Sequence, residues 1–414
     1  MPNKEGVNGY HNGTRPPDNE LSQYLHDLAF QNLSLEERRR YVSGKFGYFI
    51  SVAKLKKLNK KFNVPSVRKP PPLPVVITAV CSAAGSDIAC QNGPNSIRDQ
   101  IRQNRRMLIP RDTVRTIMHD NFPNGADLRF PGKHVPRRRG TLKIGRGVHQ
   151  EVHCDGHEKL SSKALRMGSV GIDIYGMRCH TSGRILHEVA IPHSRCSSTI
   201  GHVYLDCAEK YGMIPEKVTV DGGNETGEMY ACHVALRQKY RPDLDTESCP
   251  DWVSLPSTQN IVIESSWKQM LKFNGKTLRL AIASGFEAGF FVYTNEVHWI
   301  WSKVVQTALD EFGNYWNSHK TRRQRSAEIP TGTSPMVIYD FPGDYGLVNC
   351  GIPVEQADIE ALRASIPRSR EDCFRWVPEE WDTRITAAFV DIGSPSLNHM
   401  NAWDTFVKLY NLIK

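Results

Sequence analysis

The chain has 414 residues, enough for two or three domains, and its apolar content of 39% is ordinary for a globular protein. It contains no run of about eighteen apolar residues, which argues against a membrane span and a membrane partner. The chain has 53 basic and 44 acidic residues. Residues 31–148 contain 24 of the basic and 7 of the acidic residues, so the rest of the chain has 29 basic and 37 acidic residues. This concentration of positive charge favours a nucleic-acid partner, and a basic surface that is merely solvated is the alternative.

Residues 1–30 are polar, and the first fifteen lack the apolar segment of a signal peptide, so we predict a flexible tail and no secretion. Over 31–69 the pattern predicts a first helix-turn-helix-like unit. Ser34 with Glu37 three residues later is a capping-box signature. Ser51 then begins a second helix with one apolar and one lysine-rich face, although such a face is often only solvated.

The pattern over residues 70–125 predicts a second helix-turn-helix unit, which we expect to bind DNA. After a proline-rich spacer, helices are expected over 73–84 and 95–104, with Ile97 and Ile101 inward and arginines 98, 102 and 105 outward. A third helix is expected from Pro110. In a helix-turn-helix this helix enters the major groove, so Arg111, Thr113 and Arg115 are candidate DNA contacts. A helical bundle without DNA recognition is the alternative.

Residues 126–148 form a basic linker that contains few apolar residues. Arg137, Arg138 and Arg139 are its densest run of charge. An arm that follows DNA phosphates is the favoured interpretation, and a nuclear-import signal is compatible with it. We therefore expect the protein in the nucleus, after synthesis in the cytoplasm.

Alternating strand and helix patterns predict an α/β domain with a mixed sheet over 149–325. Strands are expected over 149–154, 171–177, 184–191 and 217–221, and helices over 199–211, 227–239, 260–272 and 300–316. Residues 326–414 have an irregular, acidic pattern to which we assign no role.

Three acids in this region stand where local structure makes acids unexpected. Asp155 and Asp221 follow predicted strands and precede glycines, and Glu264 lies in an otherwise apolar helical stretch. Carboxylates suit hard cations such as Mg²⁺ or Mn²⁺, and two such ions can promote in-line displacement at phosphorus. Solvated surface acids or a turn aspartate are the alternative. Asn260, Lys268 and Lys272 share a helix face with Glu264, which is either a DNA-facing line or a stabilising Glu–Lys arrangement.

At these positions the chain resembles the integrase-core proteins of the retroviral integrase and DDE-transposase superfamily, in particular those of transposon origin in fungal genomes. The resemblance covers roughly 90–340 and rests on four motifs. These are Glu-Val-His-Cys-Asp-Gly-His-Glu-Lys-Leu from Glu151, Pro-Glu-Lys-Val-Thr-Val-Asp-Gly-Gly-Asn-Glu from Pro215, Ser-Thr-Gln-Asn-Ile-Val-Ile-Glu-Ser-Ser-Trp from Ser257, and Tyr-Trp-Asn-Ser-His-Lys-Thr-Arg from Tyr315.

The resemblance implies an α/β RNase H-like catalytic core, with a five-stranded mixed sheet flanked by helices and preceded by all-α helix-turn-helix units. It implies that Asp155, Asp221 and Glu264 are catalytic and hold Mg²⁺ or Mn²⁺. It also implies that Asn260, Lys268 and Lys272 contact DNA near the reacting end. The expected activity is cleavage and strand transfer of double-stranded DNA by a homo-oligomer, with no small-molecule substrate.

Some features depart from the family pattern. The usual Asp-Asn-Gly is here Asp221-Gly222-Gly223-Asn224, so Asn224 is a candidate supporting residue in an altered loop. The second and third acids are 264 − 221 = 43 residues apart, which suggests an insertion. His153, Cys154 and His157 flank the first acid without further ligands at zinc spacing, so we expect His157 to support Asp155 by a hydrogen bond rather than to bind zinc.

Three functional hypotheses remain open from the sequence. The first is an active DNA integrase or transposase. The second is a catalytically silent, transposon-derived DNA-binding or scaffold protein, which the altered loop after Asp221 favours. The third is a nuclease acting on RNA–DNA hybrids, which the helix-turn-helix units disfavour because such units read duplex DNA.

Overall fold

The computed structural model describes residues 12–129, 144–156, 172–256, 259–289, 295–324 and 328–414. By internal contacts the chain divides into two compact units. The first comprises Met1–Ser86, Asn92–His134 and Ser318–Lys320, and the second comprises Asp87–Gln91, Val135–Asn317 and Thr321–Lys414. The predicted linker arginines 137–139 and His157 lie outside the described residues. No helix in the described ranges is long and apolar enough to span a membrane.

The first unit begins with three helices, α1 (Asp18–Ala29), α2 (Leu35–Phe46) and α3 (Val52–Lys61). Both predicted helix starts are found: Ser34 forms the full capping box with Glu37, and the Ser51 side chain accepts a hydrogen bond from the Lys54 amide. The predicted flexible tail is wrong over α1, because Leu21, Leu25 and Leu28 are buried. Their spacing of three and four residues forms an apolar stripe that the polar composition of residues 1–30 obscured.

The same unit continues with α4 (Leu73–Ser86), α5 (Pro94–Asn104), α6 (Arg111–Asn121) and α7 (Gly125–Arg129). Pro110 is the residue before α6, close to the helix start that the sequence predicted. Ile97 and Ile101 are buried, as expected. Arg102 is not outward as predicted, because it is only 5% exposed and its guanidinium forms an ion pair with buried Asp99 at 3.0 Å. A buried acid on the same helix compensates the arginine's burial, which periodicity alone does not reveal.

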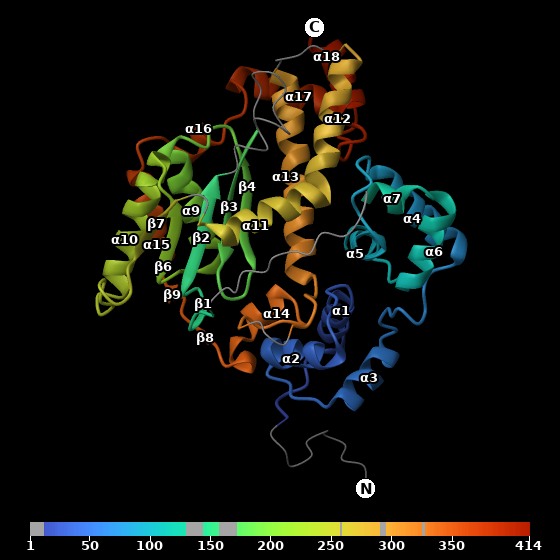
Figure 1. Cartoon of the computed structure of the whole chain (residues 1–414), viewed down its shortest axis with the longest axis horizontal. Coiled ribbons are helices and arrows are strands. Elements are labelled where there is room, and N and C mark those ends of the chain that lie inside the picture. The colour runs from blue at the N-terminus through green and yellow to red at the C-terminus, as the bar shows by residue number, and fades with distance from the viewer. Residues whose placement is uncertain (1–11, 130–143, 157–171, 257–258, 290–294, 325–327) are drawn as a thin grey trace. The chain divides into compact units, whose positions relative to one another are not determined.

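A five-stranded sheet organises the second unit (Figure 1), in the order β4-β3-β2-β6-β7. Its strands are β2 (Glu151–Gly156), β3 (Asp173–Cys179), β4 (Ile185–Ile191), β6 (Lys217–Asp221) and β7 (Trp252–Leu255). β2, β3 and β4 pair antiparallel, whereas β6 pairs parallel with both β2 and β7. This mixed sheet is compatible with the RNase H-like core that the sequence resemblance implies. β7 was not predicted, because its four residues carry no alternating pattern.

The two faces of this sheet differ in polarity. Val152 and Cys154 of β2 point into an apolar core that includes α9 (Ser197–Tyr211) and α10 (Gly227–Tyr240). The alternate residues Glu151, His153 and Asp155 lie on the opposite face, because side chains alternate along a strand. α11 (Ile261–Met270) contacts β2 and β3 on this polar face. In Figure 1 α9 and α10 lie on one side of the sheet and α11 and α13 (Asn295–Ser318) on the other.

The helix predicted over 260–272 is interrupted. α11 ends at Met270, a π-helical turn covers Leu271–Gly275, and α12 (Lys276–Glu287) follows. π-turns are rare and often lie at functional sites. Because the turn alters the helical period, Lys272 does not continue the i, i+4 line of α11 that the sequence predicted.

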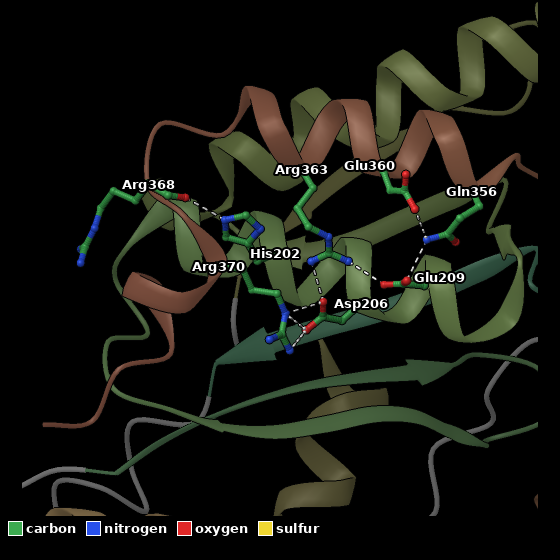
Figure 2. A network of polar contacts seen from close by, with 8 residues as sticks. All are labelled: His202, Asp206, Glu209, Gln356, Glu360, Arg363, Arg368 and Arg370. Atoms are coloured by element: carbon green, nitrogen blue, oxygen red, sulfur yellow. Dashed lines mark hydrogen bonds and ion pairs between the residues drawn. The ribbon is translucent and has the colours of Figure 1, made fainter. Parts of the chain in front are cut away.

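The C-terminal residues are helical rather than irregular, which corrects the sequence interpretation. They form α14 (Pro335–Asp340), α15 (Gln356–Ser365), α16 (Arg370–Cys373), α17 (Glu379–Asp391) and α18 (Ala402–Ile413), with the short strands β8 (Val348–Asn349) and β9 (Ile352–Pro353). α15 and α16 pack on α9 through charged side chains (Figure 2): Asp206 forms ion pairs with Arg363 at 2.7 Å and with Arg370 at 2.8 Å. α17 and α18 join the core around α13. Residues 328–414 are therefore an integral part of the second unit.

Candidate active site

The first predicted acid, Asp155, lies near the end of β2 and is 7% exposed. Its Oδ2 accepts a hydrogen bond of 2.9 Å from the indole N–H of Trp267 on α11. Gly176, the cross-strand partner of Asp155, makes this contact possible, because a Cβ there would lie 2.5 Å from the Trp267 ring. Burial of an ionised carboxylate is costly unless hydrogen-bond donors or a cation compensate it. The hydrogen bond from Trp267 compensates part of this cost and fixes the orientation of the Asp155 carboxylate.

The second acid, Asp221, ends β6, the parallel neighbour of β2. The last paired residues of these strands are His153 and Thr219, and Asp155 and Asp221 each follow two residues later. Both acids therefore project from the same face, at the carboxyl ends of adjacent strands that lie about 4.8 Å apart.

Glu264 lies on α11 between two anchors to β2. Before it, the Asn260 amide donates to the Cys154 carbonyl at 3.2 Å, and its Oδ1 lies 2.7 Å from His153 Nδ1. After it, Trp267 bonds to Asp155. Positions 260, 264 and 267 share one helical face, so Glu264, which is half-buried, is directed toward the same strand. Asn260 itself is 1% exposed, which corrects its prediction as a DNA contact.

Arg178 of β3 anchors α11 to the sheet through hydrogen bonds. The sequence did not predict this role. Its Nη1 donates to the Val262 carbonyl at 2.6 Å and to the hydroxyls of Ser265 and Ser266 at 2.7 and 3.0 Å. Burial lowers the pKa of this guanidinium to about 10, which leaves it charged at neutral pH. An arginine inside a strand with alternate apolar residues was the only available signal of this role.

The three predicted acids meet the chemical requirement for Mg²⁺ or Mn²⁺, because all their donor atoms are carboxylate oxygens. Their ligand atoms are not all within 4.8 Å of one another, so they do not surround a single point as tightly as one ion would require. Two ions about 3.5–4 Å apart need a wider set of acids. Adjacent strand ends carry Asp155 and Asp221, and Glu264 lies on the helix anchored to β2. The chemistry of these three donors therefore suits hard cations.

A different set of residues forms the tightest group of potential metal ligands within the described ranges. Glu151, His153 and His180 have ligand atoms within 4.8 Å of one another. This group lies on the same sheet face as Asp155, nearer the start of β2. Burial lowers the pKa of His153 to about 4, although Glu151 and Asn260 oppose that shift.

Beside the second acid lies an open groove of about 520 Å³. The predicted supporting residue Asn224 lines it and is exposed, in a short 3₁₀ turn (Asn224–Thr226) that leads into α10. The other lining residues are Gly223, Thr226, Gly227, Tyr230, Asp251 and Trp252. Tyr230 and Trp252 make an edge-to-face contact with ring centroids 5.2 Å apart. The altered loop after Asp221 therefore lines a groove with two aromatic residues.

The remaining predicted DNA contacts lie in different places. Lys268 is exposed on α11, and Lys272 is half-buried in the π-turn. Arg111 and Arg115 are exposed on α6 in the first unit, and Thr113 is half-buried. The Arg111 guanidinium donates to Asn95 Oδ1 at 3.1 Å, which ties the start of α6 to α5. These α6 residues belong to the first unit and the acids to the second.

The fourth motif has a structural role in the second unit. The Trp316 indole N–H donates to the Gly183 carbonyl at 2.8 Å. Asn317 exchanges two hydrogen bonds of 2.9 Å with the backbone of Ile185. The end of α13 is thus attached to the β3–β4 hairpin, from which Arg178 extends to α11.

Comparisons with known proteins place the chain in no family. No protein-family model matches the chain, and no curated protein matches it. Its similarity to a solved structure entitled "Crystal structure of the Mos1 Strand Transfer Complex" covers 88% of this chain and 100% of that one, at 9% identity and a TM-score of 0.18.

Proposed function

We propose that the protein is a DNA integrase or transposase-type polynucleotidyl transferase that cleaves and joins phosphodiesters with an Asp-Asp-Glu triad. The observation that supports this most is the placement in the fold of the elements that carry Asp155, Asp221 and Glu264. Two of these acids stand at the ends of adjacent parallel strands. The third lies between two anchors that tie α11 to the first strand. An RNase H-like arrangement of the sheet is part of this proposal.

The three acids would hold Mg²⁺ or Mn²⁺, which when bound activates the attacking oxygen and stabilises the leaving oxygen of an in-line displacement. The protein's own residues orient these acids. Trp267 holds one oxygen of Asp155, so this carboxylate keeps one orientation. Arg178 and Asn260 fix the start of α11, which sets the position of Glu264 relative to β2. Preorganised ligands of this kind lower the cost of assembling a charged site.

Double-stranded DNA is the proposed partner. In the first unit, Arg111, Thr113 and Arg115 on α6 contact bases or phosphates. The linker arginines 137–139, which lie outside the described residues, follow the DNA backbone. In the second unit, Lys268 and Lys272 contact phosphates near the reacting end. A homo-oligomer acting in the nucleus completes the proposal, since joining two DNA ends requires two sites.

The test is nicking of supercoiled plasmid by the purified chain with Mn²⁺ or Mg²⁺. The variants are Asp155→Asn, Asp221→Asn and Glu264→Gln, with Glu380→Gln on the exposed side of α17 as a matched control. The proposal predicts nicking by the wild type and the control and none by the three acid variants. Nicking that survives all three substitutions would remove the triad from the mechanism.

A second candidate function is a catalytically silent DNA-binding scaffold. It is favoured by the spread of the three acids, whose ligand atoms are not all within 4.8 Å of one another. The two functions differ in the effect of Glu264→Gln. A scaffold keeps all its DNA binding and has no nicking to lose, whereas a transferase keeps binding and loses cleavage.

A further inference from the structure

The polar face of the sheet carries a second cluster of ligand atoms beside the carboxylates, formed by Glu151, His153 and His180. Glu151 and His153 are alternate residues of β2, so their side chains lie on one face. His180 follows β3 by one residue, and its backbone N–H donates to the Glu151 carbonyl at 3.0 Å. The backbone therefore places the third side chain next to the first two.

The hydrogen bonds around His153 determine which of its nitrogens can act as a ligand. The Asn260 side-chain N–H₂ donates to the Cys154 carbonyl, so Asn260 Oδ1 faces His153 Nδ1 at 2.7 Å. An amide oxygen only accepts, and therefore Nδ1 carries the hydrogen. In the neutral imidazole Nε2 then presents a lone pair. A histidine that donates one N–H to an oxygen and presents the other nitrogen is the usual arrangement of a metal ligand.

That lone pair lies near two groups. His153 Nε2 is 3.0 Å from His180 Nδ1, which either donates a hydrogen bond to it or binds a metal ion beside it. It is also 3.3 Å from the acceptor Glu151 Oε1, which a shared cation would hold in place. Glu151 Oε1 also accepts a hydrogen bond of 2.6 Å from the Thr219 hydroxyl. The Lys217 ammonium contacts the other carboxylate oxygen, Oε2, at 2.9 Å. The lysine thus leaves Oε1 facing the imidazoles.

The spacing of the three atoms suits a small divalent ion. Zn²⁺ bonds of about 2.0–2.1 Å at tetrahedral angles place neighbouring ligand atoms about 3.3 Å apart. His153 Nε2 lies 3.3 Å from Glu151 Oε1 and 3.0 Å from His180 Nδ1, with all three atoms within 4.8 Å of one another. The two rings lie nearly parallel, with centroids 5.2 Å apart. A small closure of Glu151 and His180 toward each other would complete three corners of a tetrahedron.

We propose that Glu151, His153 and His180 bind a borderline divalent metal ion, Zn²⁺ or a similar ion, at a site separate from the carboxylate triad. Two imidazoles and one carboxylate prefer Zn²⁺ to Mg²⁺, because Mg²⁺ favours all-oxygen ligands. His153 is 4% exposed, whereas Glu151 and His180 are half-buried, so water can complete the fourth position.

The bound ion acts structurally in this proposal. It joins β2 to the turn after β3, and through the His153–Asn260 hydrogen bond it fixes the start of α11. Because α11 carries Glu264, the ion would set how this helix lies on the sheet. The proposal does not depend on whether the chain cuts DNA.

The test measures zinc directly, on the full chain after chelator treatment and dialysis. Inductively coupled plasma mass spectrometry gives zinc per chain after re-addition of Zn²⁺ and gel filtration, and Co²⁺ absorption reports the ligand geometry. Stoichiometric zinc in the wild type that persists in excess Mg²⁺, with Co²⁺ bands typical of tetrahedral coordination, is expected. A wild type that binds no zinc would mean that His180 only donates a hydrogen bond to His153, and the proposal would fail.

The variants separate this site from others. His180→Ala removes a half-buried ligand and should abolish stoichiometric binding, while His193→Ala, which removes an exposed histidine, should leave it intact. Glu264→Gln should also keep its zinc, because that acid belongs to the other site. Asn260→Ala should weaken zinc affinity by about 10–100-fold, as loss of a supporting hydrogen bond does elsewhere. If His180→Ala retains zinc as the wild type does, the ion binds elsewhere and the assignment is wrong.

Because loss of zinc could follow from misfolding, circular dichroism and gel filtration accompany each variant. Glu151→Gln gives an independent check, since it keeps the shape of the side chain and removes the negative charge. A folded Glu151→Gln variant with undiminished zinc affinity would also contradict the proposal.

Discussion

The stability of the second unit should depend on pH through one buried acid, Glu188 of β4. It is 7% exposed, and neither of its carboxyl oxygens has a hydrogen-bond partner among the described residues. Burial raises the pKa of Glu188 to about 8, with Arg178 opposing the shift and Asp310 adding to it. The acid is therefore protonated in the folded protein at neutral pH and ionised in the unfolded chain.

The sign and size of the effect follow from proton linkage. Below pH 4.5, the ordinary pKa of the group, folded and unfolded chains both hold the proton, so no penalty exists. As pH rises from 4.5 to 8, the unfolded chain gains stability by ionising, and the folded protein loses on the order of 4 kcal/mol. Glu188→Gln, which cannot ionise, should therefore be more stable than the wild type at pH 8 and similar to it near pH 4.5.

Urea unfolding at a series of pH values, followed by circular dichroism, measures this difference. The free energy of unfolding of Glu188→Gln minus that of the wild type should grow steadily over this range. Glu380→Gln, an exposed substitution on α17, serves as control and should show no such trend. Equal pH profiles for wild type and Glu188→Gln would show that Glu188 is ionised in the folded protein and would refute the reasoning.

Two further substitutions test contacts at the proposed site, and a third tests the ion pairs between α9 and the C-terminal helices. Arg178→Lys keeps the charge but loses the fork that binds α11, so it should lower the free energy of unfolding by about 2 kcal/mol and reduce nicking; an unchanged melting temperature would contradict this role. Trp267→Phe removes the donor to Asp155 and should cost about 1.5–3 kcal/mol in urea unfolding, with equal stability as the opposing result. Burial alone would raise the pKa of Asp206, but Arg370 and Arg363 outweigh it and lower the pKa, so these ion pairs stabilise the fold at neutral pH and weaken as pH falls below 3.8. Asp206→Asn should therefore cost about 1 kcal/mol at pH 7 and less at pH 3, and a constant difference between these pH values would argue against the ion pairs.

The sequence was most informative where one local rule determined the structure. Ser34 and Ser51 identified two helix starts, and the strand that ends in Asp221 was found over its full predicted length. These features depend on neighbouring residues only. The α1 helix was missed because its three buried leucines are set among polar residues in a segment whose overall composition resembles a tail.

The candidate active site was only partly predictable, because several of its contacts join residues that are far apart in the sequence. Strand ends and glycines indicated Asp155 and Asp221, but the parallel pairing that makes them neighbours is a long-range property of the sheet. Asn260 and Arg178 act through contacts with residues far away in the sequence, so neither periodicity nor charge could assign their roles. The pairing of His153 with His180 likewise depends on the β2–β3 register.

Replacing the Asp221 carboxylate by a thiolate tests the central claim most directly, because the outcome depends on whether this side chain binds the metal ion. Asp221→Cys replaces a hard oxygen by a softer sulfur, which Mn²⁺ tolerates better than Mg²⁺. Plasmid nicking by this variant should be absent with Mg²⁺ and partly restored with Mn²⁺, while the wild type nicks with both. Equal nicking by Asp221→Cys and the wild type in Mg²⁺ would show that Asp221 is no ligand and would contradict the proposed active site.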